Sequence, residues 1–569
     1  MLDNLRHRLS YANKNLLLLS VFGLVVGLFA GLVIIALRLS IETIQMEYLP
    51  DGSIEGYESL PFWARFLLPV AGAFLLGWLF QSLSANSRSI GVVHTIERLD
   101  YHQGHFPLKN AIVQFIGAAV SLISGHSVGR EGPSIHLGAA SGSLFGQCLR
   151  LPNNAIRTLV ACGVAAGIAA SFNTPLAGVI FVVEVIIFEY TLASLIPIIL
   201  AAVVATILCR AVFGHESIFT VPEITHVSNW DLPWIVFTGL IVGLFAVVYI
   251  RLLLRFSKTA THLPIWKRMT LAGIIVGVCA LFVPEIMSMG YDTVDSAILG
   301  QYTFIALVII ALIKLLATTA GLGLGLPGGL IGPCVFLGAT LGAALGQIVG
   351  LFSAEESLNI SLFAIIGMGA MMGATLQAPL AALIAIFELT LSPHIIFPGL
   401  LAIIVANLTA NEMLKQPSIF RSLLRIQGLD YKNSPTSQAL RRIGVSSVMD
   451  KAFIVLPKGS TLNAINNALK ENPKWILIDG NDETKTLMPA IDLKRYLIEH
   501  KGQTINLGEI PAERMDAAGI FLQASMQDAF EKIEQSSAEA VYIQTSAMHA
   551  EIRGIITRED IEFQQKTNI

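Results

Sequence analysis

The sequence predicts an all-α polytopic membrane domain followed by a smaller α/β domain. Of the 569 residues, 54% are hydrophobic and 14% are charged, whereas soluble proteins average about 25% charged residues. Mean hydropathy is +0.67, and apolar runs follow one another between residues 16 and 414. The last part of the chain has the composition of an ordinary soluble domain.

These composition changes divide the chain into an N-terminal segment (1–15), a membrane domain (16–428) of two repeats (about 16–225 and 226–428), and a C-terminal domain (429–569). The first apolar run, 16–37, is long enough to cross a bilayer and lacks a signal-peptide cleavage site. Arg6, Arg8 and Lys14 precede it, and basic residues also follow the last run. Because cytoplasmic flanks are rich in Lys and Arg, we expect a multi-pass protein of the cell (inner) membrane with both ends cytoplasmic.

Charge, cysteine and histidine usage argue against several classes of protein. A net charge of −3 without a basic patch disfavours a nucleic-acid partner. The five cysteines form no Cys-x-x-Cys pair, so neither a disulfide framework nor a tetrathiolate zinc site is expected. No metal site is expected from the histidines of the first half, which lack ligand spacing: His94, His102, His105, His126 and His136.

The membrane domain contains an internal repeat. Residues 129–147 (GREGPSIHLGAASGSLFGQ) and 329–347 (GLIGPCVFLGATLGAALGQ) are identical at nine of 19 positions. Residues 163–184 and 367–388 are identical at eight of 22, including the pairs Pro175/Pro379 and Glu184/Glu388. A preference of membrane helices for Gly and Ala would not by itself align prolines and glutamates between two segments at nearly the same spacing along the chain. Many transporters are built from such repeats, often inverted and with broken helices.

Each repeat carries Gly-x-x-Gly-Pro before a helical apolar run. A helix N-terminus has free N–H groups and about half a positive charge, so it binds anions without a full cation. If the repeats are inverted, two such ends approach each other at the membrane midplane. The pattern predicts an anion pathway at the interface of the two halves.

Glu131 lies inside the first of these loops. An acid within a membrane is costly and indicates function. An ionised carboxylate competes with an anion for the same N–H groups, and protonation releases it, which couples proton and anion occupancy. The structural alternative is an ion pair between Arg130 and Glu131. The second repeat has Leu330 and Ile331 at these positions, so only one half carries the acid.

The loop GREGP, the later PGGLIGP (327–333) and NTPLAG (173–178) resemble the CLC family of chloride channels and chloride/proton antiporters. The resemblance covers residues 16 to about 428. It implies an inverted-repeat CLC fold, a homodimer with one pore in each subunit, and Glu131 as the external gating glutamate and proton acceptor. It also implies anion binding around Arg130, Gly132, Leu330 and Ile331.

Two positions depart from the family pattern. Ser87-Arg88-Ser89-Ile90-Gly91 stands where the family has Gly-Ser-Gly-Ile-Pro, so Arg88, or Ser87 or Ser89 after a slip in register, replaces the pore serine. Arg88 either binds the anion more tightly than a hydroxyl or points into a watery vestibule. Phe420 aligns with the pore tyrosine and lacks its hydroxyl, so backbone donors carry more of the anion binding.

The sequence is compatible with both a channel and an antiporter. The internal proton-transfer glutamate of the antiporters is replaced by Val185, as in family channels. Glu189 lies one helical turn further on and is either a displaced relay or a residue at a cytoplasmic helix end. Glu184 and Glu388 match in both repeats and are expected to be structural acids that accept backbone N–H bonds. Lys314 is expected to pair with helix C-terminal carbonyls.

The C-terminal domain shows a β-α-β-β-α pattern twice, in 445–498 and 507–563. This order resembles a tandem pair of CBS domains, which often bind adenine nucleotides. Thr557 and Asp560 match that family's ribose-contacting pattern, although an ordinary helix N-cap has the same letters. No other cofactor is expected.

The predicted function is chloride transport through the lipid bilayer, as chloride/proton exchange gated by Glu131. A passive chloride channel of the same fold is the main alternative. An intramembrane hydrolase would need a nucleophile or metal beside Glu131, and the loop has neither, so the protein is not expected to be an enzyme. A fluoride-selective transporter of this family is disfavoured, because PGGLIGP keeps its proline and lacks that branch's asparagines.

Overall fold

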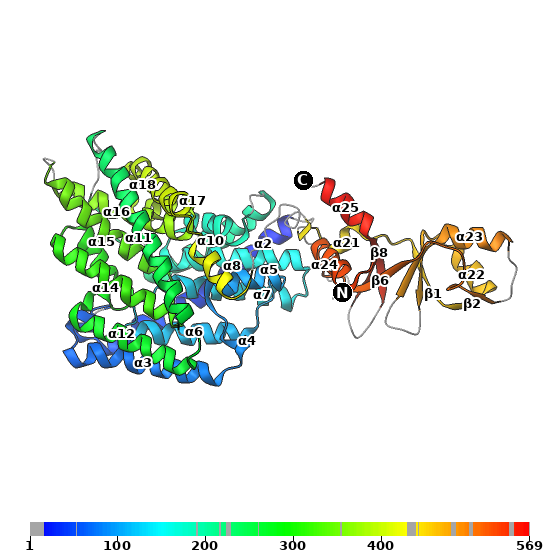
Figure 1. Ribbon diagram of the computed structural model, residues 1–569, viewed down its shortest axis with the longest axis horizontal. Coiled ribbons are helices and arrows are strands. Elements are labelled where there is room, and N and C mark those ends of the chain that lie inside the picture. Colours follow the sequence, from blue (N-terminus) through cyan, green and yellow to red (C-terminus); the bar gives the residue numbers. More distant parts are fainter. Residues whose placement is uncertain are drawn as a thin grey trace. The chain divides into compact units, whose positions relative to one another are not determined.

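The computed structural model describes residues 16–52, 54–188, 192–214, 218–222, 229–259, 261–352, 356–429, 440–441, 443–479, 485–499, 504–545 and 551–567. These divide into two compact units, a helical unit of residues 16–147 and 157–431 and a smaller unit of residues 432–569 with the segment 148–156. Strands longer than a single bridge lie only in the smaller unit, among the residues just given (Figure 1).

The helices of the first repeat are α2 (Leu16–Tyr48), α3 (Phe62–Ser82), α4 (Ala85–Arg88), α5 (Gly91–Tyr101), α6 (Leu108–Ile123), α7 (Glu131–Cys148), α8 (Asn153–Phe172), α9 (Pro175–Phe181), the π-helical turn Val182–Ile187, and α10 (Leu192–Phe213). Those of the second repeat are α11 (Leu232–Thr259), α12 (Ile265–Phe282), α13 (Tyr291–Ile298), α14 (Phe304–Gly323), α15 (Ile331–Gly350), α16 (Glu356–Leu376), α17 (Pro379–Thr390), α18 (Ile396–Leu408), the π-helical turn Thr409–Met413, and α19 (Ile419–Ile426).

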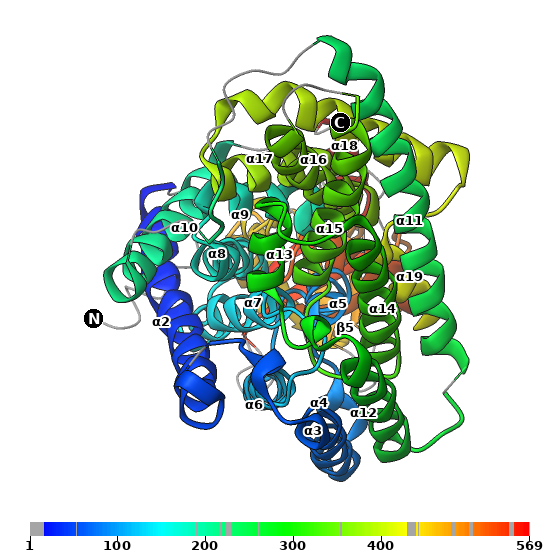
Figure 2. The ribbon, with the colours of Figure 1, turned by 90° about the vertical axis from the view of Figure 1, so that its left-hand side faces the viewer.

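The lengths of these helices confirm a polytopic membrane domain. Within the described part of the chain, nine helices are long and apolar enough to cross a bilayer, and shorter apolar helices lie among them. Figure 2 shows α7, α8, α13 and α15 in the interior, with α2, α3 and α11 at the periphery. Side-chain burial agrees, because nearly every residue of α15 is buried whereas α3 exposes Phe62, Trp63 and Trp78.

Glycines allow the helices that follow each Gly-rich loop to pack backbone to backbone. A Cβ on Gly163 of α8 would lie 1.9 Å from the carbonyl oxygen of Gly138 on α7. In the second repeat, a Cβ on Gly367 of α16 would lie 2.3 Å from the carbonyl oxygen of Gly338 on α15. Small residues at such crossings are what tight helix packing in membranes requires. The duplicated sequence thus forms the same pair of closely packed helices in each repeat.

The smaller unit has strands β1 (Phe453–Pro457), β2 (Gly459–Thr461), β3 (Trp475–Asp479), β4 (Lys485–Pro489), β5 (Thr504–Asn506), β6 (Met515–Phe521), β7 (Ala540–Gln544) and β8 (Ile552–Thr557), with helices α21 (Val445–Val448), α22 (Leu462–Leu469), α23 (Ala490–Glu499), α24 (Met526–Ser536) and α25 (Arg558–Thr567). Six strands form one sheet in the order β1-β3-β4-β6-β7-β8.

This sheet is built from two similar halves. In the first, β1 pairs parallel with β3 and β3 antiparallel with β4. In the second, β6, β7 and β8 repeat the same pairings. An antiparallel pair of β4 and β6 joins the halves, and each half has its own apolar core. The β-α-β-β-α order predicted from the sequence is therefore present twice.

Replacing Gly163 by alanine should destabilise the membrane domain, because the new Cβ would lie 1.9 Å from a backbone oxygen that cannot move aside without separating α7 and α8. Overpacking of this kind costs about 1–3 kcal/mol. Thermal unfolding of the purified protein in detergent measures the effect. Gly321→Ala is the matched control, since its Cβ would meet its nearest neighbour at an ordinary 3.5 Å. Equal melting temperatures for the two variants would contradict this account of the packing.

Candidate functional site

The two Gly-rich loops are joined at the same position of each repeat. Gly129 and Gly329 form an isolated antiparallel bridge. The N–H of Gly129 donates to the carbonyl of Gly329 at 2.9 Å, and the N–H of Gly329 donates back at 2.6 Å. This reciprocal pair is what a two-fold relation between the repeats requires. The loops predicted to meet therefore do meet.

Both helices begin directly after this bridge, α7 at Glu131 and α15 at Ile331. The loops approach so closely that a Cβ on Gly132 would lie 2.7 Å from the Cα of Gly329. Leu330 and Ile331 are buried at the start of α15. Because each helix N-terminus carries partial positive charge, the two ends together form an electropositive cradle of amide groups. We use the term amide cradle for residues 129–133 and 329–333.

The carboxylate of Glu131 lies in the amide cradle. Its Oε2 accepts the N–H of Gly332 at 3.1 Å, and its Oε1 accepts the hydroxyl of Tyr291 at 2.5 Å. The side chain is fully buried. A Cβ on Gly332 would lie 3.0 Å from Oε2, so a glycine at this position lets the carboxylate reach the amide. The acid therefore occupies the N–H group of Gly332, which directly follows the predicted anion-binding residues Leu330 and Ile331.

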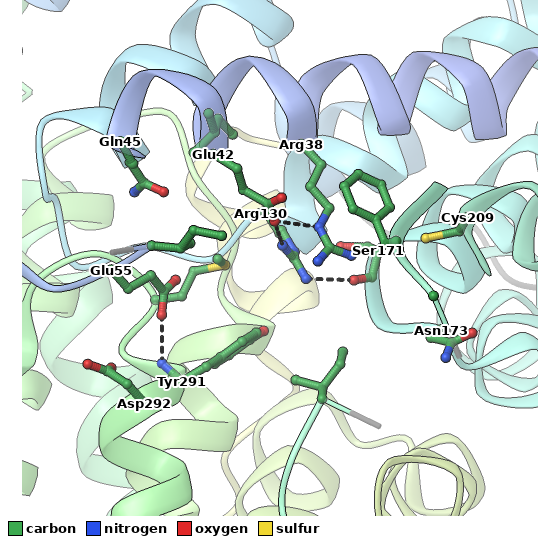
Figure 3. A pocket seen from close by; sticks show the side chains of 16 residues that line it. Arg38, Glu42, Gln45, Glu55, Arg130, Ser171, Asn173, Cys209, Tyr291 and Asp292 are labelled. Carbon is green, nitrogen blue, oxygen red and sulfur yellow. Dashed lines mark hydrogen bonds and ion pairs between the residues drawn. The ribbon is translucent and has the colours of Figure 1, made fainter. Parts of the chain in front are cut away.

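Arg130 makes contacts separate from those of Glu131. One guanidinium nitrogen donates to the carbonyl of Ser171 at 3.0 Å, and another lies 3.7 Å from the carboxylate of Glu42. Glu42 in turn accepts from Arg38 at 2.5 Å. Figure 3 shows these side chains together on one wall of a pocket. The structural alternative of an Arg130–Glu131 ion pair is thus wrong, because each side chain has other partners.

This pocket, which we call the Arg130 pocket, has a volume of about 310 Å³ and lies among the C-terminal part of α2, the segment between α2 and α3, and the start of α13. Glu55, in the segment between α2 and α3, accepts the backbone N–H of Tyr291 at 2.9 Å (Figure 3). Burial, and to a smaller extent the nearby Asp292, raise the pKa of the Glu55 carboxyl to about 7, against the opposing effects of the Tyr291 N–H, Arg130 and Lys314.

A second pocket, the Arg88 pocket, has a volume of about 370 Å³ and brings Arg88, Leu330 and Phe420 to one space. Arg88 ends α4, and one of its terminal nitrogens donates to the carbonyl of Gln81 at 3.0 Å. Its buried Nε has no hydrogen-bond partner among the described residues. The pore-position residues predicted from the family pattern thus lie around one pocket that also reaches the start of α15.

Phe420, in the first turn of α19, also lines a third pocket of about 260 Å³. Val185 of the π-helical turn and Ser418 line it too, together with Asn407 and Asn411. Val185, predicted to stand at the internal proton-transfer position, is therefore next to the same pocket as the pore phenylalanine. Glu189, the predicted displaced relay, lies outside the described residues.

Glu184 and Glu388 form a reciprocal contact between the repeats. The two oxygens of Glu184 accept the N–H groups of Leu380 and Ala381 at 3.2 and 2.8 Å, at the start of α17. Those of Glu388 accept the N–H groups of Leu176 and Ala177 at 3.0 and 2.8 Å, at the start of α9. Each acid satisfies free amides at a helix N-terminus of the other repeat. This is the structural role predicted for both.

Lys314 pairs with backbone carbonyls, as the sequence predicts, although only that of Ile286 lies at the C-terminal end of a helix, the short 3-10 turn Pro284–Ile286. Its fully buried ammonium donates to the carbonyls of Ile286, Ser288 and Met289 at 2.9, 3.0 and 3.2 Å. These carbonyls lie just before α13, so Lys314 holds the segment that presents Tyr291. Sequence reasoning missed Tyr291, because it is 160 residues from Glu131 and belongs to no repeated motif.

Thr557 and Asp560 form the helix cap that was the alternative to nucleotide binding. The hydroxyl of Thr557 donates to Asp560 at 2.7 Å, and Asp560 also accepts the backbone N–H of Thr557 at 2.9 Å. The N–H of Asp560 donates back to the Thr557 hydroxyl at 3.3 Å. This arrangement is a capping box at the start of α25. Both side chains are therefore engaged in ending β8 and starting α25.

Comparison with known proteins places this geometry in a family. The model of the voltage gated chloride channel family matches residues 72–411. A ClcB-like protein of Ralstonia nicotianae is 34% identical over 72% of this chain and 97% of its own length. The H(+)/Cl(−) exchange transporter ClcA of Vibrio cholerae is 30% identical over 70% of this chain and 88% of its own. The voltage-gated ClC-type chloride channel ClcB of Escherichia coli is 30% identical over 70% and 96%.

Solved structures share the fold. A slow cyanobacterial Cl−/H+ antiporter is 25% identical, with a TM-score of 0.64 over 72% of this chain and 97% of that protein. A eukaryotic CLC transporter is 18% identical, with a TM-score of 0.60 over 95% of this chain and 97% of that protein. The second match extends the fold similarity beyond the helical unit into the C-terminal α/β unit.

Replacing Glu388 by glutamine should lower stability, because glutamine has one acceptor oxygen for the two N–H groups at the start of α9. Loss of a hydrogen bond to a partly buried charged group costs about 1–2 kcal/mol, measured as a lower melting temperature in detergent. Glu412→Gln is the control, since the Glu412 side chain is 58% exposed and its two partners, Lys415 and Asn411, are exposed as well. If both variants melt alike, the contact between the repeats is not a source of stability.

Proposed function

Because this chain belongs to the voltage gated chloride channel family, we propose that it exchanges chloride for protons across a membrane, with Glu131 as gate and proton acceptor. The observation that carries the proposal is the hydrogen bond from the Gly332 N–H to the Glu131 carboxylate. It puts an ionisable side chain on an amide at the N-terminus of α15, where a chloride ion would bind.

Competition for the amide cradle couples the two substrates. An ionised Glu131 accepts the amide hydrogen bonds and adds a negative charge, so it excludes a second anion from the same place. A protonated Glu131 is a poorer acceptor and carries no charge, so chloride displaces it. Each proton bound at Glu131 then frees the cradle for an anion. Exchange follows if the acid gains its proton on one side of the membrane and loses it toward the other.

We propose that the Arg88 pocket opens toward the cytoplasm and the Arg130 pocket toward the opposite side. The Arg88 pocket includes Phe420 and Gln427 near the last helix before the C-terminal unit. The Arg130 pocket includes the end of α2 that is remote from the N-terminal segment. Basic residues in both terminal segments support a cytoplasmic location for the two ends, in a cell (inner) membrane. We further propose a homodimer with one pore in each subunit.

Anion binding in the central part of the pore would rest on backbone amides. Phe420 has no hydroxyl to donate, and Arg88 faces the Arg88 pocket with its Nε unpaired among the described residues. We propose that Arg88 attracts anions into that pocket, and that the amides of residues 130–132 and 330–331 bind them in the cradle. Charge in a pocket with low-dielectric walls raises the local concentration of counter-ions.

A passive chloride channel is the second candidate. Val185 supports it, because an apolar side chain there cannot take up a proton beside the third pocket, which Val185 lines together with Phe420. The names of the relatives include both exchangers and channels. We favour exchange because an exchanger and a solved antiporter are both among the relatives, and because the ionisable gate occupies the anion site itself.

For the C-terminal unit we propose a tandem pair of CBS domains. The double β-α-β-β-α order and the single six-stranded sheet support this. Adenine nucleotide binding at Thr557 and Asp560 would require their capping box to open, so we do not include a nucleotide in the proposed mechanism.

Reconstitution into liposomes distinguishes the two candidates. Vesicles are loaded with high chloride and diluted into low chloride, and the external pH is followed with an electrode while valinomycin and K⁺ clamp the voltage. An exchanger drives protons uphill into the vesicles as chloride leaves. A channel releases chloride with a flat pH trace, which would overturn the proposal of exchange.

Glu131→Gln should abolish proton movement while chloride still crosses, because glutamine cannot bind or release a proton. The liposome assay with both chloride and pH electrodes measures this. Glu412→Gln, an exposed acid, should keep coupled exchange. Proton movement driven by chloride in the Glu131→Gln variant would contradict the assigned role of Glu131.

Phe420→Tyr should tighten chloride binding about fivefold, because a neutral hydrogen bond contributes about 1 kcal/mol. Isothermal titration calorimetry in detergent measures the Kd. Phe397→Tyr changes a side chain that is 83% exposed and should leave the Kd unaltered. An unchanged Kd in Phe420→Tyr would mean that this ring does not face the anion.

A further inference from the structure

We propose that Tyr291 is a positioning residue for the gate, whose hydroxyl holds the ionised Glu131 in the amide cradle and separates it from the Arg130 pocket. This inference rests on the proposed gating role of Glu131. It adds a residue of the second repeat, outside both Gly-rich loops, to the machinery that decides when the carboxylate leaves.

The first observation is the hydrogen bond itself. The Tyr291 hydroxyl donates to Oε1 of Glu131 at 2.5 Å, while Oε2 accepts the N–H of Gly332. Each carboxylate oxygen therefore accepts from one donor among the described residues, a phenol on one side and a cradle amide on the other. A phenol that donates to a carboxylate stabilises the ionised form over the protonated one. It thereby strengthens the acid as a competitor of chloride.

The second observation is that Tyr291 is held in place on several sides. Its backbone N–H donates to Glu55 at 2.9 Å, and its ring packs edge-on against Phe219 at 5.4 Å between centroids. The Arg130 guanidinium lies 5.9 Å from the ring centroid. The preceding Gly290 has a positive φ of 72°, a conformation suited to glycine. A hydroxyl on so constrained a ring has a defined direction.

The segment before Tyr291 is also fixed. Lys314 donates to three carbonyls between residues 286 and 289, and the N–H of Ser288 donates to the carbonyl of Gly125 at 3.1 Å. A Cβ on Gly290 would lie 2.7 Å from the ring of Phe336 on α15. The support of Tyr291 therefore reaches both the segment before the first Gly-rich loop and the helix that supplies the cradle amide.

The third observation is separation. Tyr291 lines the Arg130 pocket, and Glu131 is not among the residues that line it (Figure 3). Glu131 has no exposed surface. A proton or chloride ion that enters through the Arg130 pocket thus meets Tyr291 before Glu131. Movement of the Glu131 carboxylate toward this pocket requires its hydrogen bond with the Tyr291 hydroxyl to break.

Other charged groups surround the pair and set the background of any pH response. They come from α2, the segment between α2 and α3, the first Gly-rich loop, α13 and α14: Arg38, Glu42, Glu55, Arg130, Asp292 and Lys314. Cys334 of α15 also lies near Glu131. None of them is altered by the removal of one phenolic oxygen, so Tyr291→Phe isolates the hydroxyl.

The test uses full-length protein with Tyr291→Phe, which keeps the packed ring. Chloride efflux from liposomes is measured as a function of the pH on the Arg130-pocket side. Without the donor, the ionised carboxylate is less stable, and the midpoint of activation should rise by about one pH unit, which is a tenfold change in proton affinity. At neutral pH, chloride binding measured by calorimetry should tighten several-fold, because its competitor is weaker.

Tyr57→Phe is the matched control. Tyr57 is buried, and its hydroxyl donates to the carbonyl of Leu122 at 2.8 Å without contacting Glu131. It should lower the melting temperature and leave the pH profile in place. In a Glu131→Gln background, Tyr291→Phe should leave the chloride Kd unchanged, since no ionised acid remains to be held.

An unchanged pH midpoint in Tyr291→Phe, or the same change of Kd in the Glu131→Gln background, would overturn the inference. The first outcome would mean that the hydroxyl does not hold the ionised gate, and the second that the effect is only structural. If Glu131→Gln itself retains proton coupling, the proposed function fails instead. The two failures are therefore distinguishable within one set of variants.

Discussion

The reciprocal hydrogen bonds between Gly129 and Gly329 are the contact on which the rest of the site depends. Two helix N-termini repel each other, because both carry partial positive charge and unpaired N–H groups. The bridge holds them together at the cost of this repulsion, and an anion or a carboxylate between them relieves it. A site that is stable only when negative charge is present is suited to a mobile anion and to an acid that takes its place.

The scaffold around the bridge is symmetric, whereas the chemistry is not. Both repeats supply the same glycine-packed helix pair, and Glu184 and Glu388 exchange equivalent contacts with the opposite repeat. Only the first repeat has an acid, Glu131, in its Gly-rich loop. The second repeat supplies Tyr291, which donates to this acid, and Lys314, which holds the segment before Tyr291. Symmetry thus positions the cradle, and departures from symmetry place an acid and its phenol partner in it.

The symmetric contacts do not involve the side chain of Glu131. Glu131 accepts one hydrogen bond from an amide and one from a phenol, whereas other groups form the Gly129–Gly329 bridge and the contacts of Glu184 and Glu388. Departure of the carboxylate leaves those contacts intact. Under the gating role that we propose for Glu131, a change of charge at this one side chain would alter occupancy of the cradle without a rearrangement of the helices.

The sequence by itself determined the membrane domain, the duplication, the two Gly-rich helix starts and the presence of Glu131 in only one of them. Each of these features follows from local composition or from identical residues in the two repeats. It also predicted the structural roles of Glu184 and Glu388 and the pairing of Lys314 with backbone carbonyls, but not where those carbonyls lie. Only the tertiary structure decided that Arg130 pairs with Glu42, that Arg88 and Phe420 share a pocket, and that Tyr291 donates to Glu131. These contacts join residues far apart in the chain, and no local periodicity or spacing records which side chains the packing of two repeats brings together.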